Sequence, residues 1–166
     1  MSKIESNQLT FRKFNVDDFE DLYAILSNPN VCKYLPGNGA KSKEEIEKWH
    51  MHFMRSFQDE HGSQIFAILE KGSSKVIGYG GLGYVSEFDK IEIMYGFNES
   101  VWGKGYATET SLRMKELALE LGMNTLIALA DIGNIASQKI LLKTGFKEVE
   151  HLHIWGIDCC FYELTL

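Results

Sequence analysis

The sequence has few cysteines and no long hydrophobic run, and both absences narrow the class of protein. Its three cysteines, Cys32, Cys159 and Cys160, are odd in number and lack CxxC spacing, which predicts neither a disulfide framework nor a cysteine-based zinc site. No apolar run approaches the ~20 residues that a membrane helix needs. The polar opening MSKIESNQ is unlike a signal peptide, so we expect a cytoplasmic protein with no membrane partner.

An excess of basic residues is also missing. The formal net charge is −6, which argues against nucleic acid as a partner and is compatible with a cationic small molecule or an amine. With 166 residues, 45% of them hydrophobic, and no repeat or low-complexity linker, the chain is predicted to form one domain over residues 1–166.

The first part of the chain carries one strand pattern and two helix patterns. Alternating apolar and polar residues in LTFRKF (9–14) predict a strand. The acidic pair at 17–18 can open a helix, which Asn28-Pro29-Asn30 stops. Ser42 with Glu45 forms a capping-box pattern before a second helix rich in apolar and aromatic residues.

The middle of the chain predicts an antiparallel meander. Three β-branched and aromatic runs are separated by turn residues: QIFAILE (64–70), VIGYGGLGYV (76–85) and IEIMYGF (91–97).

The second half alternates helix and strand patterns. A helix is expected from about 105 to 121, then the apolar strand TLIALA (125–130), a short helix at 136–143, and two last strands, GFKEVEHLHIW and CCFYELTL. Because strand–helix–strand alternation implies at least one parallel pairing, the predicted fold is α/β (α+β): a mixed, mostly antiparallel sheet of about seven strands with helices on both faces.

Two glycine motifs compete for the role of a phosphate site. GYGGLGYV (78–85) matches G-x-G-x-x-G, but it lies inside a strand pattern and opens no helix, so we interpret it as a glycine-rich strand. WGKGYA (102–107) instead follows a strand and opens a helix. Glycine amides, the helix dipole and Lys104 would together suit a pyrophosphate there, although a glycine-eased turn into a core helix explains the spacing equally well.

Two longer stretches resemble a known family. Y-x-F-x-x-x-x-W-G-K-G-Y-A-T-E (95–109), followed by N-x-x-S-x-x-[IL]-L-x-K-x-G-F (134–146), resembles the GNAT superfamily of acetyl-CoA-dependent N-acetyltransferases. The opening at 9–36 and the closing FYELTL resemble the branch that contains the ribosomal-protein N-terminal acetyltransferases. Trp102 stands where the superfamily commonly has Gln or Arg, although Trp is familiar in this branch.

The resemblance implies acetyl-CoA as co-substrate and direct acetyl transfer to a primary amine, for which a protein N-terminus is one candidate. A polyamine, an aminoglycoside or an amino acid is an alternative acceptor, and a non-catalytic CoA-binding module is an alternative function. The family resemblance also implies that the strands near 91–97 and 125–130 splay apart. The residues expected to contact the coenzyme are Tyr95, Gly96, Phe97, Trp102, Gly103, Lys104, Gly105, Tyr106, Ala107, Thr108, Asn134 and Ser137.

Three residues are candidates for the chemistry. The resemblance assigns oxyanion stabilisation to a backbone N–H of the strand, for which we choose Tyr95, and protonation of the leaving thiolate to Ser137. Glu92, a carboxylate in an otherwise apolar strand, is the candidate base. Glu92 could equally face solvent, Ser137 could serve only the helix start, and a water relay could replace a single base.

The remaining distinctive residues predict less. His151 and His153 share a strand face, but no third ligand is evident, so no metal is expected. Aromatic residues that can line an acceptor pocket, or simply belong to the core, are Tyr34, Trp49, Phe53 and Trp155. The protein is expected to be a monomer or a homodimer.

Overall fold

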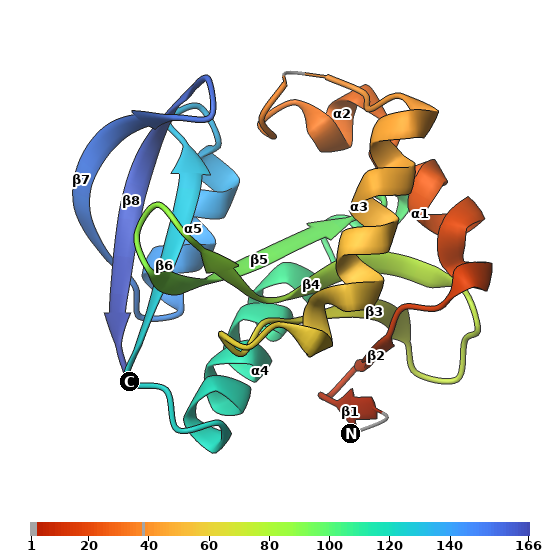
Figure 1. Cartoon of the computed structure of the whole chain (residues 1–166), viewed down its shortest axis with the longest axis horizontal. Coiled ribbons are helices and arrows are strands. Elements are labelled where there is room, and N and C mark those ends of the chain that lie inside the picture. The colour runs from red at the N-terminus through yellow and green to blue at the C-terminus, as the bar shows by residue number, and fades with distance from the viewer. Residues whose placement is uncertain (1–2, 38) are drawn as a thin grey trace.

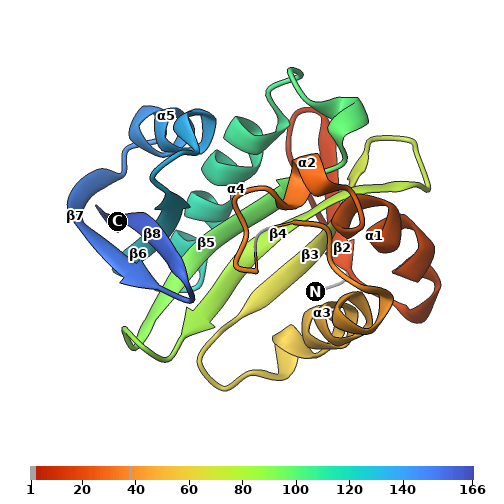
Figure 2. The ribbon, with the colours of Figure 1, turned by 90° about the horizontal axis from the view of Figure 1, so that it is seen from above.

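The computed structural model describes residues 3–37 and 39–166, which form one mixed sheet with helices on both faces (Figures 1 and 2). The strands of the described chain are β1 (Lys3–Glu5), β2 (Leu9–Lys13), β3 (Gln64–Glu70), β4 (Val76–Val85), β5 (Lys90–Phe97), β6 (Thr125–Asp131), β7 (Lys147–Ile154) and β8 (Ile157–Thr165). Their order across the sheet is β1-β2-β3-β4-β5-β6-β8-β7.

The sheet is antiparallel except where β5 meets β6. The predicted mixed, mostly antiparallel sheet is therefore confirmed, with eight strands among the described residues in place of about seven. The additional strand is β1, whose three residues, KIE, are too short and too polar for a strand pattern.

The helices are α1 (Phe19–Leu26), α2 (Pro29–Cys32), α3 (Lys43–Arg55), α4 (Tyr106–Glu120) and α5 (Ile135–Lys143), with short 3₁₀ turns at Val16–Asp18, Ser56–Gln58 and Glu99–Val101. Figure 2 shows α1 and α3 on one face of the sheet and α4 and α5 on the other. The alternation of β3 explains this arrangement, because Ile65, Ala67 and Leu69 pack in the α1–α3 core. Phe66 and Ile68 face the α4 core.

Capping residues fix where the first helices begin. The Ser42 hydroxyl accepts a hydrogen bond from the Glu45 amide, and the Glu45 carboxylate accepts one from the Ser42 amide, so the predicted capping box is confirmed. The stop expected at 28–30 was only partly right. Asn28 caps a new short helix, α2, in which Pro29 occupies the first turn.

The glycine-rich run 78–85 is part of β4, which confirms the strand interpretation. Its glycines allow close packing: a Cβ on Gly78 would lie 2.5 Å from the Phe97 ring, and one on Gly81 would lie 2.0 Å from the Gln64 carbonyl oxygen. The run therefore lets neighbouring strands approach and holds no phosphate loop.

Within residues 3–37 and 39–166, no helix is long and apolar enough to cross a membrane.

Candidate functional site

The two halves of the sheet separate along β5. On one side β5 pairs with β4 over eight residue pairs, from Lys90 to Phe97. On the other side its ladder with β6 contains the single pair Glu92↔Ile127. Beyond Glu92 the two parallel strands diverge, as the resemblance implied, and β5 presents a free edge to the space between them. An extended ligand arm can add to such an edge as a strand does.

At the far end of β5 the chain enters α4 through a loop that keeps its amides available. Gly103 and Gly105 have φ of 82° and 81°, a left-handed conformation that disfavours other residues. Gly105 is the N-cap of α4 and provides no side-chain cap. Within the described chain, the amides of residues 103–108 have no hydrogen-bond acceptor. Unpaired amides at the N-terminus of a helix, together with the helix dipole, are able to bind an anion.

Two contacts affect the position and the charge of this loop. The Trp102 indole donates to the Phe97 carbonyl over 3.0 Å, so it fixes the loop to the end of β5. Lys104 Nζ lies 3.5 Å from a Glu70 carboxylate oxygen, which partly offsets the positive charge expected there. The sequence pattern gave no indication of Glu70, because it sits 34 residues before Lys104, at the end of β3.

Glu70 also accepts a hydrogen bond from the Tyr106 hydroxyl. That bond raises the pKa of Tyr106 to about 12 and lowers the pKa of Glu70. The Tyr106 ring is otherwise buried in the core beneath α4, so its role in the described structure is to anchor the first turn of the helix.

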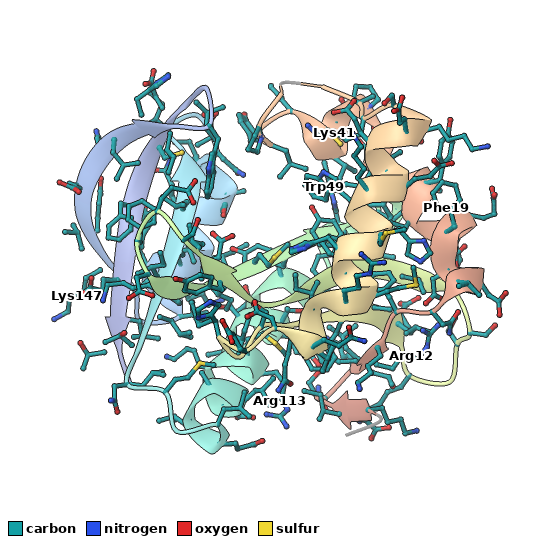
Figure 3. The ribbon with its side chains drawn as sticks, viewed as in Figure 1. Arg12, Phe19, Lys41, Trp49, Arg113 and Lys147 are labelled. Atoms are coloured by element: carbon teal, nitrogen blue, oxygen red, sulfur yellow. The ribbon has the colours of Figure 1, made fainter. Side chains whose placement is uncertain are left out.

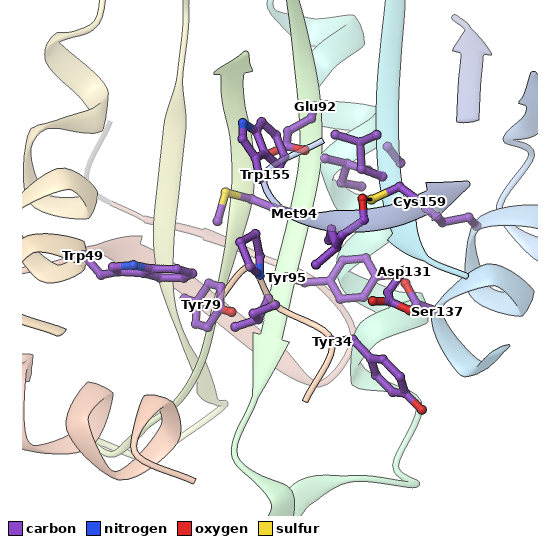
Figure 4. A pocket seen from close by; sticks show the side chains of 17 residues that line it. Tyr34, Trp49, Tyr79, Glu92, Met94, Tyr95, Asp131, Ser137, Trp155 and Cys159 are labelled. Atoms are coloured by element: carbon purple, nitrogen blue, oxygen red, sulfur yellow. Dashed lines mark hydrogen bonds between the residues drawn. The ribbon is translucent and has the colours of Figure 1, made fainter. Parts of the chain in front are cut away.

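A cleft of about 260 Å³ opens where β5 and β6 diverge (Figure 4). Its lining is rich in aromatic side chains and includes Tyr34, Trp49, Tyr79, Tyr95 and Trp155, with the carboxyl groups of Glu92 and Asp131 and the hydroxyl of Ser137. Figure 3 shows Trp49 reaching toward the centre of the molecule from α3, whereas Lys147 lies at the outer side by β7.

The expected pocket aromatics are thus largely brought together, with one exception. Tyr34, Trp49 and Trp155 line the cleft. Phe53 does not: it is buried in the α1–α3 core, where its ring stacks on Tyr79 at 5.2 Å between centroids. Its position on the helix brings it over the sheet, away from the cleft.

Glu92 is half-buried within this cleft, and Figure 4 shows Trp155 beside it. Loss of solvent raises the pKa of Glu92 to about 7, and the negative charge of Glu87 adds to the effect. No side chain or amide of the described residues donates a hydrogen bond to its carboxyl group. A carboxyl group in this state can exchange a proton near neutral pH.

Tyr95 and Ser137 meet across the splay. The Tyr95 hydroxyl lies 3.3 Å from Ser137 Oγ, and burial raises the pKa of the tyrosine. The Ser137 amide donates to the side chain of Asn134, which is the N-cap of α5, so the expected capping role of Asn134 is observed. The Ser137 hydroxyl points into the cleft, toward the Tyr95 hydroxyl (Figure 4).

Asp131 also lines the cleft, where β6 ends. One of its carboxylate oxygens accepts a hydrogen bond from the Gly133 amide at 2.8 Å. Asp131 therefore shapes the turn into α5 as well as adding negative charge to the wall.

Sequence reasoning missed the contact that closes one end of the cleft. Trp155 and Gly156 have φ of 53° and 78° and form the tight turn between β7 and β8. This turn directs the Trp155 indole to the Glu87 carboxylate, in the turn between β4 and β5. A Trp-Gly pair is an uncommon hairpin signal, and the sequence separation of 68 residues hides the partner.

One class of acetyltransferases has a mixed sheet whose strands splay apart, with a loop of unpaired amides at the end of the splay. The fold described above has both features. Residues 8–147 match the family model described as "Acetyltransferase (GNAT) domain", and the chain belongs to that family of acetyltransferases.

Named relatives agree with this assignment. The uncharacterized N-acetyltransferase p20 of Bacillus licheniformis is 26% identical over 153 residues, which cover 89% of this chain and 84% of p20. Two solved structures share the fold. The microcin C7 self-immunity acetyltransferase MccE, in complex with acetyl-CoA and AMP, has a TM-score of 0.78, 18% identity, and coverage of 96% of this chain and 93% of its own. The ribosomal L7/L12 α-N-protein acetyltransferase RimL, in complex with coenzyme A, has a TM-score of 0.80, 17% identity, and coverage of 99% and 98%.

Proposed function

We propose that this acetyltransferase moves the acetyl group of acetyl-CoA directly to a primary amine within a ternary complex. The observation that carries the proposal is Glu92: a half-buried carboxyl group that receives no hydrogen bond from the described residues, with its pKa raised to about 7, in the cleft where β5 and β6 part. Family membership supports acetyl-CoA as the donor. MccE, which shares the fold, was solved with acetyl-CoA.

The loop before α4 would hold the pyrophosphate of the donor. Its amides at 103–108 have no hydrogen-bond acceptor among the described residues, and the left-handed Gly103 and Gly105 give the loop its conformation. Residues Tyr95, Gly96 and Phe97 on the free edge of β5 would pair with the pantetheine arm, and Asn134 and Ser137 would contact it from α5. The bound thioester supplies an activated acetyl group at the mouth of the splay.

Two different side chains of the cleft would handle the two proton transfers of the reaction, from the amine and to the sulfur. Glu92 accepts the proton that the amine loses as its nitrogen bonds to the acetyl carbon, directly or through a water. The backbone N–H of Tyr95 stabilises the oxyanion, a contribution of about 3 kcal/mol for one donor. Ser137, with the Tyr95 hydroxyl 3.3 Å away, donates a proton to the sulfur as the carbon–sulfur bond breaks. Ser137 regains a proton from solvent and Glu92 releases one to solvent, so the amine proton is in net terms transferred to the thiol.

Two classes of acceptor fit this chemistry. RimL acts on the N-terminus of a ribosomal protein, and its shared fold makes a protein N-terminal amine one candidate. The Trp155–Glu87 contact lies at one end of the cleft, and the carboxyl groups of Glu92 and Asp131 in its wall can attract a cation, which suits a small amine such as a polyamine, an aminoglycoside or an amino acid.

Thiol release from acetyl-CoA tests the proposal against a panel of amines that includes peptides with free N-termini. Release with at least one amine, together with formation of the acetylated amine, is the expected result. Binding of acetyl-CoA without thiol release across the panel would instead support a CoA-binding module that does not turn over.

A further inference from the structure

The outer edge of the sheet holds a second group of reactive side chains, separate from the cleft. Glu148 and His151 lie on β7, three residues apart, and a regular strand would point them to opposite faces. The register of β7 against β8 shifts between Glu148 and Glu150, so that Val149 is an extra residue in the ladder. This β-bulge turns both side chains to one face. There His151 Nε2 lies 2.6 Å from a Glu148 carboxylate oxygen.

The neighbouring strand places a thiol beneath this pair. Cys160 of β8 is the direct partner of His151 across the ladder. It is buried in the core that α4 and α5 cover, whereas the adjacent Cys159 points to the other face and lines the cleft. The donor atoms of Glu148, His151 and Cys160 all lie within 4.8 Å of one another. The bulge thus gathers one nitrogen, one oxygen and one sulfur donor at an exposed edge.

We propose that Glu148, His151 and Cys160 bind a zinc ion, which cross-links β7 to β8. Imidazole, carboxylate and thiolate are the three ligand types that Zn²⁺ takes, and the negative charges of the thiolate and the carboxylate balance the charge of the ion. Bonds of about 2.0–2.3 Å set tetrahedral donors roughly 3.5 Å apart. Because Glu148 and His151 are exposed, rotation of their side chains closes the remaining distance. A fourth position is left for water.

The sequence pattern offered only His151 and His153 as metal ligands. In the structure, Glu148 and Cys160 are the additional ligands that lie near His151. His153 shares the strand face with His151, but its Nδ1 contacts Asp158 at 2.8 Å and it takes no part in the cluster. The actual partners of His151 depend on the bulge at Val149 and on the pairing of β7 with β8, neither of which the spacing of histidines reveals. Since Cys160 faces away from the cleft, the ion would brace the hairpin that carries Trp155 and would stay outside the acetyl-transfer chemistry.

Titration of the metal-free, reduced full-length protein with Co²⁺, as a spectroscopic substitute for Zn²⁺, tests the proposal. The expected result is one ion per chain with an intense thiolate-to-cobalt charge-transfer absorption, which one equivalent of Zn²⁺ abolishes. Cys160→Ser should remove the absorption. His151→Ala and Glu148→Gln should weaken Zn²⁺ binding at least about tenfold.

Cys159→Ser and His153→Ala are matched controls, because each replaces the same residue type on the same hairpin outside the cluster. Both should retain the absorption and the affinity. If Cys160→Ser fails to fold, the Zn²⁺ affinity of His151→Ala still tests the proposal, because His151 is exposed and its replacement should leave the fold intact. Absence of a thiolate band in the wild type, or equal loss of affinity in His151→Ala and His153→Ala, would overturn the proposal and leave the His151–Glu148 contact as an ion pair only.

Discussion

Trp155 and Glu87 join the tips of two hairpins across one end of the cleft, the indole N–H donating to the carboxylate. One hairpin connects β7 to β8 and the other connects β4 to β5. The contact therefore spans the two halves of the sheet that separate along β5, and it places an aromatic ring and a negative charge beside Glu92.

Trp155→Phe should keep the ring and remove the donor. We expect the KM for the amine to rise several-fold while the affinity for acetyl-CoA stays the same, because the contact closes the end of the cleft that is far from the loop before α4. Steady-state kinetics together with calorimetry separate the two quantities. His153→Ala, on the same hairpin, serves as control; an unchanged KM in Trp155→Phe would show that this end of the cleft does not receive the amine.

Glu92→Gln should lower kcat/KM by about 10²-fold at pH 8, the lower range for loss of a general base. Because the pKa of Glu92 is about 7, the wild-type rate should lose a further factor of about ten per pH unit below pH 7, beyond the fall that protonation of the amine itself causes. The variant should show only the fall due to the amine. Glu87→Gln removes a negative charge that helps to raise the pKa of Glu92. The fall in rate that depends on Glu92 should therefore begin at a lower pH in this variant. A wild-type profile that Glu92→Gln leaves unchanged would point to a water relay without this residue.

The same shift has a consequence for stability. Folding raises the pKa of Glu92 from 4.5 to about 7, so the protonated form is the one that the folded state favours. The stability that this preference contributes is complete below pH 4.5 and is lost as pH rises to about 7. Relative to Glu92→Gln, the wild type should therefore lose at most about 3 kcal/mol over that window in denaturant unfolding.

Ser137→Ala should reduce kcat by roughly tenfold or more and leave the dissociation constant of acetyl-CoA within about twofold, as expected for a group that acts on the leaving sulfur. The helix should persist, since Asn134 caps α5 through the Ser137 amide and the amide remains. Tyr95→Phe removes the neighbouring hydroxyl and tests whether the pair acts together. Equal losses of kcat and of acetyl-CoA affinity in Ser137→Ala would assign the serine to binding.

Glu70→Gln should tighten acetyl-CoA binding several-fold. The substitution removes the negative charge 3.5 Å from Lys104 but keeps an oxygen that can accept the Tyr106 hydrogen bond. The gain should shrink at high salt, because Lys104 is exposed and its interactions are screened. Glu99→Gln, which alters a carboxylate that Asn28 and Asn30 hold, is the control. Weaker binding in Glu70→Gln would mean that Glu70 orders the loop instead of competing for Lys104.

Much of the fold was predictable because local chemistry fixed it. Ser42 with Glu45 marked a helix start, and the strand context of GYGGLG separated it from a phosphate loop. The loop at 102–107 was recognisable for the same reason, since its glycines stand between a strand and a helix. Here sequence neighbours are also spatial neighbours.

The remaining features depend on contacts between distant segments. Glu70 contacts Lys104 because the end of β3 lies next to the loop before α4. Trp155 contacts Glu87 because the tips of their two hairpins face each other. The bulge at Val149 has no clear sequence signal, so the grouping of His151 with Cys160 could not be predicted either. Phe53 had the pattern of a pocket aromatic, and only the packing of α3 on the sheet shows that it is core.

In the proposed complex, the amides before α4 bind the pyrophosphate of acetyl-CoA. Gly105→Ala tests it, because φ of 81° costs a residue with Cβ about 1–2 kcal/mol and forces the loop out of its conformation. Gly122→Ala is matched to it: φ there is 79°, an added Cβ again meets nothing within 4 Å, and the site is the other end of the same helix.

The decisive measurement is calorimetric titration of acetyl-CoA into the wild type and both variants. The account predicts binding to the wild type and to Gly122→Ala with similar affinity, and binding at least about tenfold weaker to Gly105→Ala, which corresponds to 1.4 kcal/mol. No binding to the wild type, or equal affinity in all three proteins, would contradict it.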